Sequence, residues 1–144
     1  MEMIKNISEQ KEIFNDYTQN FIEQEVDEKK IGGYKDKQAH SVFVMDESLL
    51  VDAIFTEYNE SFKNLLALES LFHDIGRFEQ LKVMGNFFDN EVANFYPGMQ
   101  DHGDIGAKVI SSDNLLEKLI PDVRLYDEEV QKVIKLHSKV NPDI

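Results

Sequence analysis

The chain contains no cysteine, and this absence limits the chemistry that it can support. Without thiols there are no disulfides and no thiolate ligands, so a metal site would have to be built from His, Asp and Glu. Nitrogen and oxygen donors of this kind favour hard or borderline divalent ions. The lack of cysteine is compatible with a reducing compartment, and we expect the protein to be cytoplasmic.

Basic residues are scarce. The sequence has 15 Lys and Arg against 28 Asp and Glu, a formal net charge of -13 at pH 7. Such a charge disfavours a nucleic-acid polymer or an anionic membrane as the natural partner.

Long apolar runs are also missing, because no segment approaches the roughly 18 apolar residues of a membrane span. The first residues, 1–10, carry charges where a signal peptide would be apolar, so we expect no membrane association.

The alternation of polar and apolar residues that marks a strand is absent, and apolar residues instead recur at helical spacing. This pattern predicts helices over 7–26, 35–58, 60–73, 101–111 and 127–138, with a short helical turn around 115–119. Gly32-Gly33 predicts a break between the first two helices, and Phe43 and Leu50 are expected to face inward. A chain of 144 residues fits one domain with one core, so we predict a single all-α domain.

The stretch from 75 to 100 is irregular, with turn residues such as Gly85 and Pro97, and we interpret it as a lid or wall beside a cleft. It contains the aromatic residues Phe87, Phe88, Phe95 and Tyr96. These rings could stack on a nucleotide base or could simply pack the loop against the core. Aromatic clusters are usually core, which favours packing.

The helix with the densest apolar pattern, 60–73, ends in the run Leu71-Phe72-His73-Asp74-Ile75-Gly76-Arg77. Neighbouring His and Asp supply a neutral nitrogen donor and an anionic oxygen donor, a mixture that suits Zn, Fe, Mn or Mg. Because the helix stops there, both side chains can reach one ion. Gly76 is expected to adopt a turn conformation closed to other residues. For such a dipeptide alone, a core histidine beside a solvated carboxylate is the commoner explanation.

The chain has 4 histidines, and the other three lie in separate predicted helices. The apolar neighbours of His40, His102 and His137 place each imidazole on the inward face of its helix. Any one of them could be a hydrogen-bonded core histidine. Buried imidazoles are costly unless they have partners, however, so their convergence on His73 and Asp74 is most simply explained by metal coordination.

These motifs resemble those of the HD superfamily of metal-dependent phosphohydrolases, and most of all the small bacterial HD-domain hydrolases of unassigned substrate. The motifs stand in the order Lys37-Gln38-Ala39-His40-Ser41, His73-Asp74-Ile75-Gly76-Arg77-Phe78-Glu79-Gln80, Asp101-His102-Gly103 with Gly106, and His137-Ser138-Lys139. The resemblance extends from about Gly33 to the carboxyl end. It implies a helical bundle of the HD and phosphodiesterase type with a metal-binding core.

By this resemblance, His40, His73 and Asp74 would be ligands of a first metal. Asp74 would bridge to a second ion held with His102 and His137, which gives one or two divalent ions, Fe, Mn, Zn or Mg. The family pattern is completed by an aspartate on a helix beyond the last histidine, whereas only Asp143 follows His137 here. Residues 1–144 would then be a single HD domain that lacks the family's C-terminal helices. It would be either a fragment of a longer protein or a degenerate member.

The resemblance and the ligand types together predict hydrolysis of a phosphomonoester or phosphodiester, with a nucleotide as the substrate expected by family analogy. In this hypothesis Asp74 orients the nucleophile and Arg77 clamps a phosphate through paired hydrogen bonds. Lys37, one helical turn before His40, would attract phosphate as a point charge. The alternative for both cations is a surface ion pair. The alternative for the whole chain is a binding or regulatory module without catalysis, and a homodimer is compatible with either hypothesis.

Overall fold

The computed structural model describes residues 4–55, 60–112, 114–120 and 127–136. Its elements, in chain order, are α1 (Ile7–Gln24), α2 (Glu28–Phe55), α3 (Glu60–Phe72), α4 (Gly76–Met84), the 3-10 helix η1 (Asp89–Glu91), α5 (Val92–Phe95), α6 (His102–Ser112), α7 (Leu115–Leu119) and α8 (Asp127–Leu136). The described ranges contain no strand, so the predicted all-α fold is confirmed.

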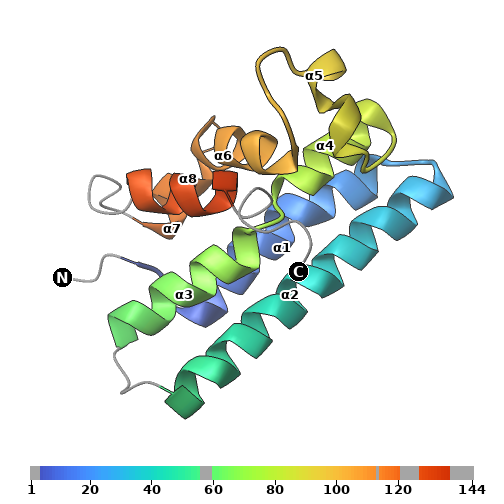
Figure 1. Cartoon of the computed structure of the whole chain (residues 1–144). Coiled ribbons are helices and arrows are strands. Elements are labelled where there is room, and N and C mark those ends of the chain that lie inside the picture. The colour runs from blue at the N-terminus through green and yellow to red at the C-terminus, as the bar shows by residue number, and fades with distance from the viewer. Residues whose placement is uncertain (1–3, 56–59, 113, 121–126, 137–144) are drawn as a thin grey trace.

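The longest helices, α1, α2 and α3, run alongside one another, and α4 continues beyond the end of α3 (Figure 1). A second group consists of α6, α7 and α8, in which α6 packs against α7, α8 and α4. Within the described ranges, none of the helices combines the length and apolarity needed to span a bilayer.

Aromatic rings fill the centre of the core where α1, α2, α3 and α4 meet. The Phe14 ring meets Phe72 and Phe78 edge to face, with ring centroids 5.5 and 6.1 Å apart, and the Tyr34 ring stacks on Phe78. All four side chains are essentially inaccessible to solvent. Rings of this size bury the largest apolar areas in a core, so they fix the positions of the helices that carry them. Phe72 is the last residue of α3, and its anchoring therefore also fixes the residues that follow it, His73 and Asp74.

The predicted break at Gly32-Gly33 is wrong, because α2 runs through both glycines. The helix starts after Asp27, whose Oδ1 accepts a hydrogen bond from the backbone N–H of Lys29 at 2.9 Å. Gly33 is needed for space instead: a Cβ atom there would lie 2.7 Å from Leu81 Cδ2 of α4. The glycine therefore lets α4 approach α2 closely.

The inward face of α2 differs in part from the predicted one. Among the side chains of α2 that the structure describes, Tyr34, Ser41 and Met45 are buried, and Val42 and Leu49 pack partly buried against the core. Phe43 and Leu50, by contrast, are 61% and 57% exposed. The reason is that α2 contains apolar residues all round, so its periodicity alone does not select one face.

The segment 75–100, predicted to be irregular, begins with a regular helix. In α4 the side chains of Phe78, Leu81 and Met84 are buried, and the helix ends at Gly85, which has a left-handed φ of 79°. The short helices η1 and α5 follow. Of the aromatic residues in this segment, Phe87 and Tyr96 pack against the core, while the side chains of Phe88 and Phe95 are exposed.

Helices α4 and α6 come into backbone contact at Gly76 and Gly106. A Cβ atom on Gly76 would lie 2.4 Å from both the Gly106 nitrogen and the His102 carbonyl oxygen. Gly76 is not among the residues with positive φ, so the expected turn conformation is wrong, and it is the close helix contact that excludes other residues. This contact brings the first turn of α6, which carries His102, against the start of α4.

Replacing Gly76 with alanine should therefore destabilise the fold. We expect Gly76→Ala to lower the free energy of unfolding by about 1–3 kcal/mol in urea denaturation, because the added methyl group meets backbone that cannot move aside. Gly32→Ala is the matched control, since a Cβ atom there meets nothing within 4 Å. In a helix interior this control should stabilise by about 0.5–1 kcal/mol. Equal effects of the two substitutions would contradict the proposed packing role of Gly76.

Candidate metal centre

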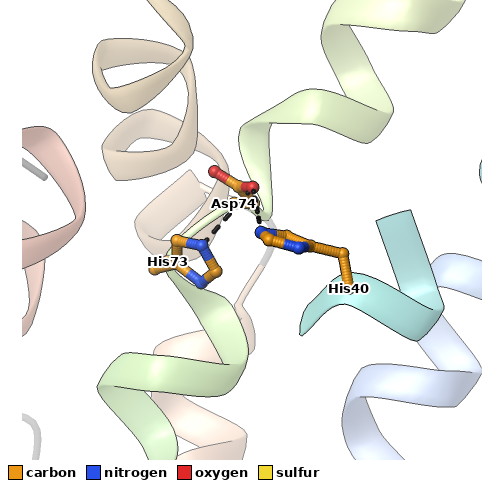
Figure 2. A group of neighbouring side chains, drawn as sticks. All are labelled: His40, His73 and Asp74. Atoms are coloured by element: carbon orange, nitrogen blue, oxygen red, sulfur yellow. Dashed lines mark ion pairs between the residues drawn. The ribbon is translucent and has the colours of Figure 1, made fainter. Parts of the chain in front are cut away.

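His73 and Asp74 lie in a tight turn, residues 73–75, between α3 and α4. The turn is held by two backbone hydrogen bonds, from Ile75 N to the Phe72 carbonyl at 3.1 Å and from Arg77 N to the Asp74 carbonyl at 2.9 Å. Ile75 is fully buried and anchors the turn in the core. In this turn the two side chains face each other instead of diverging around a helix, as Figure 2 shows.

The carboxylate of Asp74 is the point on which the histidines converge. Its Oδ2 lies 3.6 Å from His40 Nε2 and 3.4 Å from His73 Nε2, and its Oδ1 lies 3.1 Å from His102 Nε2. Figure 2 shows the first two of these contacts, with His40 reaching across from α2. Asp74 itself is only 6% exposed. Three segments that are distant in sequence, α2, the 73–75 turn and α6, therefore each bring one imidazole to a single buried carboxylate.

The spacing of these atoms fits a divalent cation. Ligand atoms of His40, His73 and Asp74 all lie within 4.8 Å of one another. Two donors that each lie about 2.1 Å from an ion are about 3.0 Å apart at a right angle and about 3.4 Å apart at a tetrahedral angle. The separations to Asp74 fall in or just above this range. These residues could therefore hold a metal with little movement.

The outer nitrogens of two rings, His73 and His102, each face an oxygen that can only accept a hydrogen bond. His73 Nδ1 lies 2.6 Å from the Ser70 carbonyl oxygen, and His102 Nδ1 lies 2.7 Å from Asp89 Oδ2. Carbonyl and carboxylate oxygens only accept, so each Nδ1 donates, and each neutral ring presents an Nε2 lone pair to Asp74. A lone pair facing an anionic oxygen is unfavourable unless a cation lies between them, and metal-binding histidines show this same arrangement.

His40 differs from the other two histidines in its exposure. Its side chain is 47% exposed, whereas His102 is buried. His40 and His73 face Oδ2 of Asp74, and their ring centroids are 5.5 Å apart, while His102 faces Oδ1. The centre is therefore open to solvent on the α2 side and closed on the α6 side. His137, the remaining predicted ligand, and Asp143 lie outside the described residues.

Lys37 lies beside the centre on α2. It is half-buried, and its Nζ lies 5.0 Å from the centroid of the Phe87 ring. Burial lowers the pKa of its ammonium from the ordinary value of 10.5, and the negative charge of Asp74 is the first of the influences that act in the opposite direction. The lysine charge thus acts on the same carboxylate as the histidines, and its predicted role in binding phosphate stays a prediction.

Arg77, the other predicted phosphate-binding residue, is held by the protein itself. Its Nη1 donates to Gln80 Oε1 at 2.9 Å, to the Phe87 carbonyl at 3.0 Å and to Asp89 Oδ1 at 3.2 Å. These bonds direct the guanidinium toward η1 rather than toward the open side at His40. The predicted role as a phosphate clamp stays a prediction, and what the structure gives Arg77 is a set of internal partners.

Asp89 is a residue of this centre that sequence patterns do not reveal. It lies in η1, contacts both His102 and Arg77, and is partly exposed. An aspartate in an irregular segment has no periodicity that could mark it as functional. The available signal is chemical: a ligand histidine usually needs a partner for its second nitrogen, which calls for a carboxylate or carbonyl somewhere in the fold.

Residues 38–143 match the family model of the HD domain. The match covers more than half of the chain, so this protein belongs to the HD domain family, whose members are generally metal-dependent phosphohydrolases. The resemblance inferred from the motifs is thereby confirmed. No curated protein and no solved structure matched the chain.

Removing one imidazole should abolish tight metal binding. We expect His73→Gln to weaken binding of Zn(II) or Mn(II) by more than about 100-fold in isothermal titration calorimetry. Losing a residue that hydrogen-bonds to a metal ligand costs about 10- to 100-fold in affinity, and losing the ligand itself should cost more. Asp46→Asn, which removes an exposed carboxylate from α2, is the control and should bind like the wild type. Unchanged affinity in His73→Gln would show that the metal binds elsewhere.

Proposed function

We propose that this protein hydrolyses a phosphomonoester or phosphodiester bond in a small substrate, with a nucleotide as the substrate class. We assign the metal ligands to His40, His73, Asp74 and His102. The observation that carries this proposal is the set of imidazole nitrogens directed at both oxygens of one buried carboxylate. Family membership supports the reaction class.

We further propose that residues 1–144 act as one domain. The support is that α1, which precedes the matched range, shares the core with it through the contact of Phe14 with Phe72 and Phe78. Those rings hold the end of α3, so the segment before the matched range contributes to the position of the centre.

A divalent cation bound by these ligands would activate a water molecule for attack and would neutralise charge on the phosphoryl oxygens. The side chains of the protein would supply the remaining functions. Asp74 orients the attacking water, and Lys37 attracts the phosphate on the open side of the centre. In a chain with a net charge of -13, such a local cation is required if an anionic substrate is to enter.

The nucleotide assignment has its own support in the segment beside the centre. Phe88 directly precedes Asp89, which contacts His102, and its side chain is exposed. Phe95, on α5, is also exposed. Exposed aromatic faces of this kind can stack on a base, an interaction worth about 1–3 kcal/mol per base.

The direct test is hydrolysis by metal-stripped protein supplied in turn with Mn(II), Fe(II), Zn(II) and Mg(II). The substrates are p-nitrophenyl phosphate, its bis ester, and a panel of nucleoside monophosphates and cyclic nucleotides. We expect metal-dependent turnover that falls by at least about 1,000-fold in Asp74→Asn, since that carboxylate touches every ligand. A protein that binds metal but remains inert toward the whole panel would instead support the non-catalytic binding module.

Lys37 provides a sharper test of how phosphate is bound. We expect Lys37→Met to lower kcat/KM by about 10- to 100-fold, mainly through KM, which corresponds to losing one charge-assisted contact of about 1.5–3 kcal/mol. Lys35→Met makes the same chemical change at an exposed position on the same helix and should have little effect. Equal kinetics for the two variants would exclude Lys37 from substrate binding.

A further inference from the structure

Asp89 lies directly behind His102, on the opposite side of the ring from Asp74. Its Oδ2 is 2.7 Å from His102 Nδ1, and the other ring nitrogen, Nε2, is 3.1 Å from Asp74 Oδ1. The buried imidazole is thus held between two carboxylates, one from the 73–75 turn and one from η1. The first of these belongs to the proposed ligand set, and the second has no role in it.

The orientation of the Asp89 carboxylate is fixed by hydrogen bonds to its other oxygen. Oδ1 accepts from Arg77 Nη1 at 3.2 Å, from Gln80 Nε2 at 3.1 Å and from the backbone N–H of His102 at 3.2 Å. Gln80 is fully buried, and its own oxygen accepts from Arg77. Because all of these donors converge on Oδ1, Oδ2 is the oxygen that must face the imidazole.

We propose that Asp89 is a positioning residue, which holds His102 as the tautomer protonated on Nδ1 so that the lone pair of Nε2 faces Asp74. Carboxylate partners of this kind orient ligand histidines in metal sites and raise their basicity. Arg77 and Gln80 take part by keeping Asp89 in its orientation. The consequence for metal binding rests on the proposed function, whereas the tautomer can be measured without any metal.

The substitution Asp89→Asn tests the tautomer directly. The asparagine oxygen must take the place of Oδ1, where Arg77, Gln80 and the His102 N–H all donate. The amide NH₂ then faces His102 Nδ1, which can only accept from it. The hydrogen of the neutral ring therefore moves to Nε2, the nitrogen that should bind the metal. The variant keeps the shape of the side chain, so the fold should be retained.

The measurement is the imidazole ¹⁵N spectrum of the metal-free protein at alkaline pH, where the rings are neutral and the two tautomers have distinct nitrogen shifts. We expect His102, assigned by its absence in His102→Gln, to be protonated on Nδ1 in the wild type and on Nε2 in Asp89→Asn. His73 is an internal control, because its Nδ1 donates to the Ser70 carbonyl and should be unchanged. A wild-type His102 protonated on Nε2 would overturn the proposal whether or not Asp89→Asn folds.

The second readout is affinity for Zn(II) by calorimetry. We expect Asp89→Asn to bind about 10- to 100-fold more weakly than the wild type, the usual cost of losing such a partner. Asp46→Asn, with the same change of charge at an exposed position, should bind normally. A tautomer switch without an affinity change would remove Asp89 from the metal site. If the wild type shows the Nδ1-protonated ring but binds no metal, the proposed function fails and the positioning role stands.

Discussion

The feature on which this structure depends is a buried carboxylate that imidazole nitrogens approach from several directions. Asp74 is almost inaccessible to solvent, and the outer nitrogens of His73 and His102 face oxygen acceptors, so in their neutral forms both rings turn Nε2 lone pairs toward the carboxylate. Burying an anion among lone pairs is costly unless positive charge compensates it. A divalent cation held between these side chains would satisfy all of them at once.

The rest of the fold holds the Asp74 carboxylate and the imidazoles around it close to one another. The aromatic contact between Phe14 and Phe72 fixes the end of α3, and the backbone contact at Gly76 brings α6 against the start of α4. Asp89 then sets the orientation of His102 within α6. The first contact fixes the position of a helix, the second lets two backbones approach closely, and the third orients the ring of His102. The α2 side is left open, with His40 and Lys37 at the entrance.

Much of the fold could be predicted from sequence, because helical periodicity is a local signal and α3, α6 and α7 follow it closely. The break predicted at Gly32-Gly33 was wrong because α2 continues through both residues, and Gly33 serves a close contact with α4 that no local pattern records. The His73-Asp74 pair stood out through its residue types and its place at a helix end. Asp89 did not stand out in the sequence, because its contact with His102 forms only when η1 folds back onto α6.

The most direct measurement of the central claim is a crystal structure of the protein grown with Mn(II), with anomalous diffraction used to locate the ion. We expect an anomalous peak within about 2.3 Å of Asp74 Oδ2 and of the Nε2 atoms of His40 and His73, the usual range for such bonds. Well-diffracting crystals in which Mn(II) binds only at other carboxylates, with no peak beside Asp74, would contradict the claim that these residues form a metal centre.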